Sequence, residues 1–132
     1  MILGIGSDIV EIDRIGAVFY KFPEAIAVKM LSSLELERYV KINTDANKIS
    51  YIAKRFAAKE AFAKALGIGI GKCGLKNIQV INKDSGKPQI ITSIDLHKHF
   101  NLPVTKQINV EISLSDERRY AIAFVVIWSG IN

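Results

Sequence analysis

The sequence contains a single cysteine, Cys73, and two histidines among its 132 residues. One cysteine excludes an internal disulfide and a metal site built from several thiolates, so we expect a protein of a reducing compartment, the cytoplasm. No apolar run approaches the roughly 18 residues that a transmembrane helix needs. The apolar amino-terminal segment lacks the basic leader of a signal peptide, so the sequence predicts neither secretion nor a membrane partner.

Several kinds of catalytic site lack the residues that they require. His97 and His99 stand two residues apart in a polar segment without further ligands, which indicates surface histidines and not a zinc site. Ser113 and Ser115 have no Gly-x-Ser-x-Gly surroundings, so nothing supports a serine hydrolase. Cys73 has no positioned histidine and is interpreted as a bystander.

The length and composition are those of one globular domain over residues 1–132. Hydrophobic residues make up 49% of the chain and charged residues 23%, which excludes a disordered or fibrous protein. Helix patterns precede strand patterns in blocks, which predicts an α+β fold. The predicted helices cover 11–20, 33–42, 47–66 and 93–100, and the predicted strands cover 2–7, 75–81, 89–92, 108–114 and 120–128. The last strand is mostly apolar, so we expect it to be buried on both faces or paired at a subunit contact.

The positive charge is concentrated in one stretch of the chain. Residues 48–87 carry nine Lys and Arg side chains against two acidic ones, a net charge of +7, whereas the other 92 residues sum to −2. Such clustering favours a multiply charged anionic partner, with a solvated basic surface as the plain alternative. A non-enzymatic module that binds RNA or a phosphorylated ligand would use the same stretch, but its few aromatic side chains form no evident stacking platform for nucleic acid.

The segment 67–74 is rich in glycine and follows the longest predicted helix. Its G-x-G-x-x-G spacing over residues 69–74 matches the dinucleotide-binding string, but that string opens a helix after a strand, and this one follows a helix. Exposed backbone N–H groups between Lys64 and Lys72 would suit phosphate oxygens. A flexible linker explains the glycines equally well.

Glu60 is an acid within the apolar stripe of the predicted helix 47–66. At 100° per residue it lies about 40° from Phe56 and about 20° from Ile49 around the helix axis. A buried, unpaired carboxylate is costly, so Glu60 needs a cation. Lys64, one turn further on, offers an ordinary i,i+4 ion pair, and a hard cation such as Mg²⁺ is the alternative.

Asp8 also has two interpretations. It ends the first predicted strand and stands three residues before Glu11, which is the spacing of a helix capping box with Asp8 as the cap. Alternatively, the fold brings Asp8 beside Glu60, and the two carboxylates with the basic loop form a site for a metal and phosphate. Sequence spacing leaves both interpretations open.

Two segments of the chain closely resemble the signature motifs of bacterial holo-[acyl-carrier-protein] synthases, a family of small 4′-phosphopantetheinyl transferases. They are Gly4-Ile-Gly-Ser-Asp-Ile-Val-Glu-Ile-Asp-Arg-Ile15 and Arg55-Phe-Ala-Ala-Lys-Glu-Ala-Phe-Ala-Lys-Ala-Leu-Gly-Ile-Gly-Ile70. Two later segments, 85–88 and 112–124, are also similar to family segments. The resemblance runs in order from about residue 2 to residue 127.

The resemblance implies an antiparallel sheet packed against a long central helix, and a homotrimer with the coenzyme in a cleft between subunits. It implies transfer of the 4′-phosphopantetheine group from coenzyme A to a serine of apo-acyl carrier protein in fatty acid biosynthesis. Mg²⁺ is the implied cofactor, and holo-acyl carrier protein and adenosine 3′,5′-bisphosphate are the implied products. A relaxed transferase that modifies other carrier domains is the alternative within this class of enzyme.

The resemblance also assigns residues to roles. Asp8 and Glu60 match the family's metal ligands, and Lys64 matches its second-motif lysine, so these three are the expected catalytic residues, with Glu60 as the candidate base. The positions that contact phosphate and nucleotide match Arg55, Lys64, Gly67, Gly69, Gly86, Lys87 and Pro88. One position departs from the pattern, because Asp116 stands where many members carry histidine, and the role of that histidine does not transfer.

Acyl carrier proteins are acidic, so the resemblance implies a basic docking face. Arg14 and Lys21 lie at i and i+7 and share one face of the first predicted helix, and Lys29 extends this basic region. Without the resemblance, these three side chains would be interpreted as ordinary surface charges.

Overall fold

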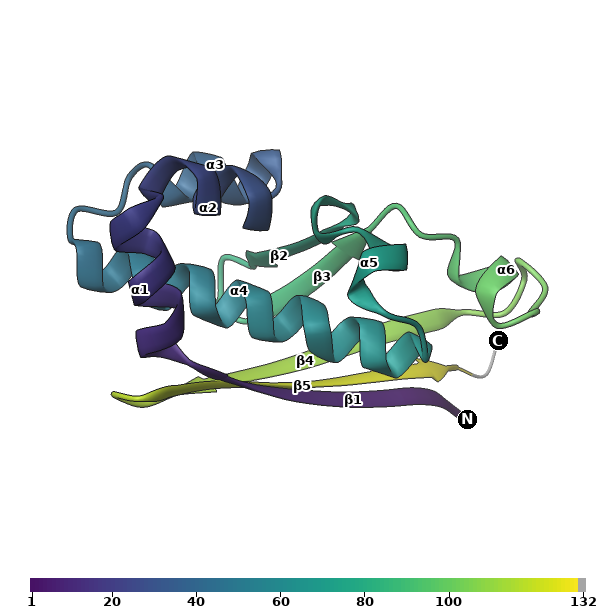
Figure 1. Ribbon diagram of the computed structural model, residues 1–132. Coiled ribbons are helices and arrows are strands. Elements are labelled where there is room, and N and C mark those ends of the chain that lie inside the picture. Colours follow the sequence, from purple (N-terminus) through teal and green to yellow (C-terminus); the bar gives the residue numbers. More distant parts are fainter. Residues whose placement is uncertain (131–132) are drawn as a thin grey trace.

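The computed structural model describes residues 1–130, in which a long helix lies across one face of a three-stranded antiparallel sheet (Figure 1). The strands follow the order β1-β5-β4, and β2 and β3 pair as a separate two-stranded sheet. This architecture confirms the predicted α+β fold. The elements are β1 Ile2–Glu11, α1 Ile12–Lys21, α2 Pro23–Met30, α3 Ser33–Tyr39, α4 Asp45–Leu66, α5 Ile70–Cys73, a 3-10 turn Leu75–Asn77, β2 Ile78–Asn82, β3 Pro88–Thr92, α6 Leu96–His99, β4 Ile108–Asp116 and β5 Tyr120–Ser129.

Helix α4 is long because both of its ends are capped and its interior is rich in alanine. At its start the Thr44 hydroxyl accepts a hydrogen bond from the Asn47 N–H at 3.2 Å, and at its end Gly67 adopts a left-handed conformation with φ of 74°. Most of its side chains are buried, because α4 packs against the sheet on one side and against α1, α2 and β2 on others. The burial therefore extends beyond the single apolar stripe that the sequence predicts.

Two glycines bring α4 directly onto β1. A Cβ atom on Gly4 would lie 1.9 Å from the Ala65 carbonyl oxygen, and one on Gly6 would lie 2.0 Å from the Ala61 carbonyl oxygen. The backbone of the helix therefore rests on the backbone of the strand, with no side chain between them at these points.

Alternation along β5 gives the sheet an inner and an outer face. The inner residues pack under α4 and have no exposed surface: Ala121, Ala123, Val125 and Ile127. On the outer face, Ile122, Phe124 and Trp128 remain 37–45% exposed. The expectation that this strand is buried on both faces is therefore wrong for the single chain, while the expected subunit contact stays a prediction.

The amino-terminal part of the chain differs from the prediction in two places. β1 continues past Asp8, because its residues pair with β5 as far as Glu11, and α1 begins at Ile12 with Glu11 at its N-cap. The capping-box interpretation of Asp8 is therefore wrong. Helix α2 lies between the predicted helices 11–20 and 33–42, where the sequence predicts no element, and it begins at Pro23, a first-turn position that suits proline.

Smaller differences occur in the middle of the chain. The glycine-rich segment contains the one-turn helix α5, and the predicted strand 75–81 starts only at Ile78 because the 3-10 turn precedes it. Ser32 caps α3 in a reciprocal capping box with Glu35. None of the helices within residues 1–130 has the length and apolar character that crossing a membrane requires.

We expect Gly6→Ala to destabilise the fold, because the added methyl group would push α4 away from β1. Overpacking of this kind costs about 1–3 kcal/mol in the free energy of unfolding, which urea denaturation measures. Gly71→Ala in α5 is the control, since no heavy atom lies within 4 Å of a Cβ atom there, and it should leave the stability unchanged or slightly higher. Equal stability of Gly6→Ala and wild type would contradict the direct backbone contact.

Candidate functional site

Asp8 lies on β1 with its side chain on the inner face of the sheet. Antiparallel pairing places it opposite Ala123, and strand alternation puts it on the same face as Gly6 and Val10. Its side chain is only 17% exposed. On this face of β1, the residue that follows Gly4 and Gly6, the two glycines in contact with α4, is therefore a carboxylate directed toward α4.

Lys64 reaches from α4 to Asp8. Its Nζ donates to Asp8 Oδ1 at 3.1 Å and to the Ser7 carbonyl oxygen at 3.0 Å. The structure thus pairs Lys64 with Asp8 and not with Glu60, the i,i+4 partner that the sequence suggests. The Lys64 side chain remains 55% exposed, so its ammonium group is accessible to an anionic ligand.

Glu60 lies one turn before Lys64 on α4 and is partly buried. Burial raises the pKa of its carboxyl group, the negative charge of Asp8 raises this pKa further, and the positive charge of Lys64 lowers it. Because Lys64 pairs with Asp8 and follows Glu60 by one helical turn, the fold brings the two carboxylates into one region, although they lie far apart in the sequence. Burial likewise raises the pKa of the Cys73 thiol, and the charge of Glu60 adds to the rise.

Two carboxylates that repel each other beside an exposed ammonium group suit a divalent cation that also binds an anionic ligand. Mg²⁺ uses one or two protein carboxylates and completes its coordination with waters and phosphate oxygens. Within residues 1–130, no group of three or more His, Cys, Asp or Glu side chains is arranged to hold a metal ion. Asp8 and Glu60 are two carboxylates of the kind that Mg²⁺ uses when waters and phosphate oxygens complete its coordination.

Gly67 and Gly69 follow the carboxyl end of α4, close in sequence to Lys64. Both are exposed, and no heavy atom lies within 4 Å of a Cβ atom built on either residue. The Gly67 N–H donates to the Lys64 carbonyl oxygen at 3.0 Å, so the helix cap holds this turn in place. The open space over the turn leaves room for a ligand that also reaches the Lys64 ammonium group.

Arg55 lies on α4 and is almost completely buried. Its guanidinium group stacks on the Tyr51 ring, with Cζ 3.9 Å from the ring centroid, and its Nε has no hydrogen-bond partner among the described residues. Burial lowers the pKa of this guanidinium group. Arg55 borders a pocket of about 600 Å³, whose other basic residues are Arg38, Lys41 and Lys54. The unpaired Nε–H donor of Arg55 and the neighbouring basic side chains suit an anionic ligand in this pocket.

The turn between β2 and β3 contains three of the expected coenzyme-binding residues. Gly86 has a φ of 88°, which glycine adopts without strain, Lys87 pairs with Glu111 on β4 at 3.0 Å, and Pro88 begins β3. The structure therefore brings Asp8, Glu60 and Lys64 together but leaves this turn on the separate two-stranded sheet.

Arg14 and Lys21 are both exposed on α1, two turns apart. Asp116, which replaces a frequent family histidine, ends β4 on the inner face opposite Ala121. Its Oδ2 accepts a hydrogen bond from the Ser50 hydroxyl at 3.4 Å, and its Oδ1 lies 3.9 Å from Lys54 Nζ, so this acid links β4 to the first half of α4.

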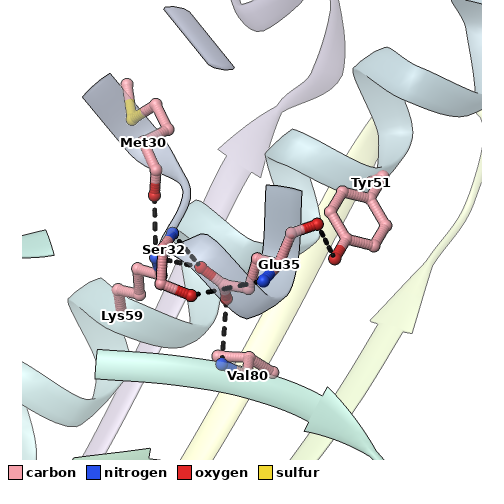
Figure 2. A network of polar contacts seen from close by, with 6 residues as sticks. All are labelled: Met30, Ser32, Glu35, Tyr51, Lys59 and Val80. Atoms are coloured by element: carbon pink, nitrogen blue, oxygen red, sulfur yellow. Dashed lines mark hydrogen bonds and ion pairs between the residues drawn. The ribbon is translucent and has the colours of Figure 1, made fainter. Parts of the chain in front are cut away.

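The sequence interpretation missed the ion pair of Lys59 and Glu35, whose side chains are completely buried (Figure 2). Lys59 follows Ile52 by seven residues and precedes Phe62 by three, so helical spacing already places it on the apolar stripe. It was instead counted with the basic stretch of the chain. One positive charge of that stretch is therefore inaccessible to any partner from solution.

The chain is similar to known proteins over nearly its full length. The model of the 4′-phosphopantetheinyl transferase superfamily matches residues 4–129. The holo-[acyl-carrier-protein] synthase of Ehrlichia canis (strain Jake) is 41% identical over 131 residues, which are 98% of this chain and 97% of that protein.

Two solved structures are similar over nearly their full lengths. The holo-[acyl-carrier-protein] synthase of Neisseria meningitidis matches with a TM-score of 0.82 and 40% identity, covering 97% of this chain and 99% of that chain. The holo-(acyl-carrier-protein) synthase of Bacillus anthracis, in complex with CoA (3′,5′-ADP), matches with a TM-score of 0.78 and 37% identity, covering 96% of each chain. Since the family match contains Asp8, Glu60 and Lys64 and spans almost every residue, the protein belongs to the 4′-phosphopantetheinyl transferase superfamily.

Proposed function

We propose that this protein transfers the 4′-phosphopantetheine group from coenzyme A to a serine of apo-acyl carrier protein, with Mg²⁺ as cofactor, in the fatty acid biosynthesis of the cytoplasm. The products are holo-acyl carrier protein and adenosine 3′,5′-bisphosphate. The observation that carries the proposal is the meeting of Asp8, Glu60 and Lys64, because two carboxylates and an accessible cation are the groups that pyrophosphate chemistry requires. The names of the relatives support the choice of coenzyme and carrier protein.

The reaction joins the serine oxygen of the carrier protein to the β-phosphorus of coenzyme A. The bond from this phosphorus to the bridging oxygen breaks, and adenosine 3′,5′-bisphosphate leaves with the electron pair. Negative charge grows on the phosphate oxygens and on the leaving group, so cations held nearby lower the barrier. Asp8 and Glu60 would hold Mg²⁺, which would supply positive charge to this reaction. We propose that the Lys64 ammonium group binds a phosphate oxygen, and the 55% exposure of its side chain supports this role.

The serine hydroxyl must lose its proton as it attacks. Glu60 is our candidate base, directly or through one water, because its carboxylate lies one turn from Lys64, the residue that we propose binds the phosphate under attack.

Coenzyme A carries a 3′-phosphate and a pyrophosphate, so its binding residues are expected to be basic or rich in backbone N–H groups. Arg55 and its basic pocket fit a phosphate, and Gly67 and Gly69 provide open backbone next to Lys64. Gly86, Lys87 and Pro88 lie on the β2–β3 turn, and we propose that they contact the coenzyme in a cleft between two copies of the chain.

A homotrimer would cover the apolar outer face of the sheet. The outer side chains of β1 and β5 include the exposed residues Ile5, Ile9, Ile122, Phe124 and Trp128, whereas β4 turns Asn109, Glu111, Ser113 and Ser115 outward. Exposed apolar surface on two adjacent strands marks an interaction site. We propose that this surface is the subunit interface.

We expect Phe124→Glu to convert trimers into monomers, because the new carboxylate would be buried without a partner in the interface. Light scattering after gel filtration measures the mass, which should fall from about three chain masses to one. Val104→Glu introduces the same charge at a highly exposed position away from the sheet and should leave the trimer intact. A monomeric wild type, or a trimeric Phe124→Glu variant, would contradict this interface.

We expect Arg14→Glu to raise the KM for acyl carrier protein by about tenfold, because the reversed charge repels an acidic partner. Steady-state kinetics should show an unchanged KM for coenzyme A. Lys98→Glu reverses an exposed charge on α6 and serves as the control with an unchanged KM for both substrates. An unchanged KM for the carrier protein in Arg14→Glu would argue against docking at Arg14 and Lys21.

We expect Asp8→Asn and Glu60→Gln each to lower kcat/KM by about 100-fold or more, because each removes a negative charge from the cation site while keeping the side-chain shape. Mass spectrometry of the carrier protein follows the transfer. Glu24→Gln, an exposed acid on α2, is the control and should retain full activity. Near-normal turnover of either variant at saturating Mg²⁺ would show that the metal binds elsewhere.

Chelation separates this enzyme from a basic module that binds RNA. Removal of Mg²⁺ with EDTA should abolish the transfer, and added Mg²⁺ should restore it. Binding of RNA through the basic stretch would instead depend on salt and change little on chelation. RNA binding that persists with no transfer at any Mg²⁺ concentration would favour the module.

A further inference from the structure

The ion pair of Lys59 and Glu35 lies on the side of α4 that faces away from Gly4 and Gly6 of β1. Both side chains have no exposed surface, and Lys59 Nζ lies 2.5 Å from Glu35 Oε1. Burial lowers the pKa of the Lys59 ammonium group, and the Glu35 carboxylate offsets part of this effect. Transfer of two charges into a protein interior is costly, so such a pair persists only with good geometry and further hydrogen bonds.

Further hydrogen bonds surround the pair on every side (Figure 2). Glu35 Oε1 also accepts a bond from the Ser32 N–H at 2.8 Å, and Glu35 Oε2 accepts one from the Val80 N–H at 2.9 Å. Lys59 Nζ donates to the Met30 carbonyl oxygen at 2.7 Å, at the end of α2. The network therefore joins four elements, α2, α3, α4 and β2, through directional contacts.

Apolar side chains of similar volume would hold these elements at least as firmly, because a buried ion pair is a poor source of stability. A hydrogen-bonded network differs from apolar packing in that it is satisfied at only one rotation and one axial position of α4. The ion pair is therefore best explained by its effect on the position of α4, and not by what it adds to the stability of the fold.

Glu60 is the residue next to Lys59, so the two side chains leave α4 about 100° apart. Lys59 is held by Glu35 of α3 and by the Met30 carbonyl oxygen of α2, and on another side the backbone at Ala61 and Ala65 rests on Gly6 and Gly4. A rotation of α4 by 20° would move a carboxylate about 6 Å from the axis by about 2 Å. A displacement of about 1 Å is already enough to impair catalysis.

We propose that Lys59 and Glu35 are positioning residues: their buried ion pair fixes the rotation of α4 and thereby holds the Glu60 carboxylate beside Asp8. This inference rests on the proposed function, in which Asp8 and Glu60 bind the metal. Neither Lys59 nor Glu35 touches the substrates. Their contribution should therefore appear in the affinity of the metal site as well as in turnover.

The test compares the uncharged double variant Lys59→Met/Glu35→Gln with Leu31→Ala. Leu31 is fully buried between α2 and α3, so its truncation weakens the same region while leaving the ion pair in place. Electron paramagnetic resonance measures Mn²⁺ binding in the presence of coenzyme A and without carrier protein, so that no turnover occurs. Thermal unfolding gives the stability of each variant, and kinetics give kcat and the half-maximal concentration of Mg²⁺.

We expect the double variant to fold, to bind Mn²⁺ about tenfold more weakly and to need correspondingly more Mg²⁺. Leu31→Ala should lose stability but keep the wild-type affinity for Mn²⁺. Wild-type affinity in the double variant, or an equal loss of affinity in Leu31→Ala, would overturn the inference. If the double variant does not fold, Lys59→Leu/Glu35→Gln, which also leaves no unpaired buried charge, takes its place with the same outcomes.

The wild-type protein separates this inference from the proposed function. If wild type binds no Mn²⁺ and shows no transfer that depends on Mg²⁺, the proposed function fails. If wild type does both and only the variants depart from expectation, the function stands and the positioning role of Lys59 and Glu35 is refuted.

Discussion

The direct contact between α4 and β1 is the constraint on which the rest of the structure depends. At Gly4 and Gly6 the strand presents bare backbone to the carbonyl oxygens of Ala65 and Ala61. This contact allows side chains of the strand and of the helix to meet across a short gap. The next inward residue of the strand is Asp8, and the helix supplies Glu60 and Lys64 one turn apart. Because Gly4 and Gly6 have no side chains, α4 can lie close enough to β1 for Asp8 to meet Lys64 and Glu60.

Two clusters of charged side chains lie on different sides of helix α4, and their surroundings differ. On one side, the Lys59 and Glu35 charges are buried, paired and surrounded by hydrogen bonds, which leaves no site for a ligand. On the other side, Asp8 and Glu60 repel each other and Lys64 is half exposed. Lys59 and Glu60 are adjacent residues of α4 in opposite situations. The charge of Lys59 is paired within the protein, whereas the Glu60 carboxylate lies beside the like charge of Asp8 and can accept an external cation.

Much of the fold could be predicted from local patterns. The caps of α4, the alternation of β4 and the position of Glu60 inside an apolar stripe are all visible in short windows of sequence. The course of β1 through Asp8 could not be predicted in this way, because it is decided by pairing with β5, more than one hundred residues later. The buried pair was missed for a similar reason, since Glu35 belongs to a helix capping box and nothing in the sequence indicates that Lys59 lies against it. The sequence offered Lys64 as the ion-pair partner of its neighbour Glu60, with Mg²⁺ as the alternative, because Asp8 approaches Lys64 only in the folded chain.

The surroundings of Cys73 have a practical consequence. This thiol is 2% exposed, and burial together with the charge of Glu60 raises its pKa, which disfavours the reactive thiolate. The chain has no other cysteine. A cysteine introduced on the surface would therefore be the dominant target of a maleimide dye, so fluorophores can be attached for energy-transfer measurements without first removing the native residue.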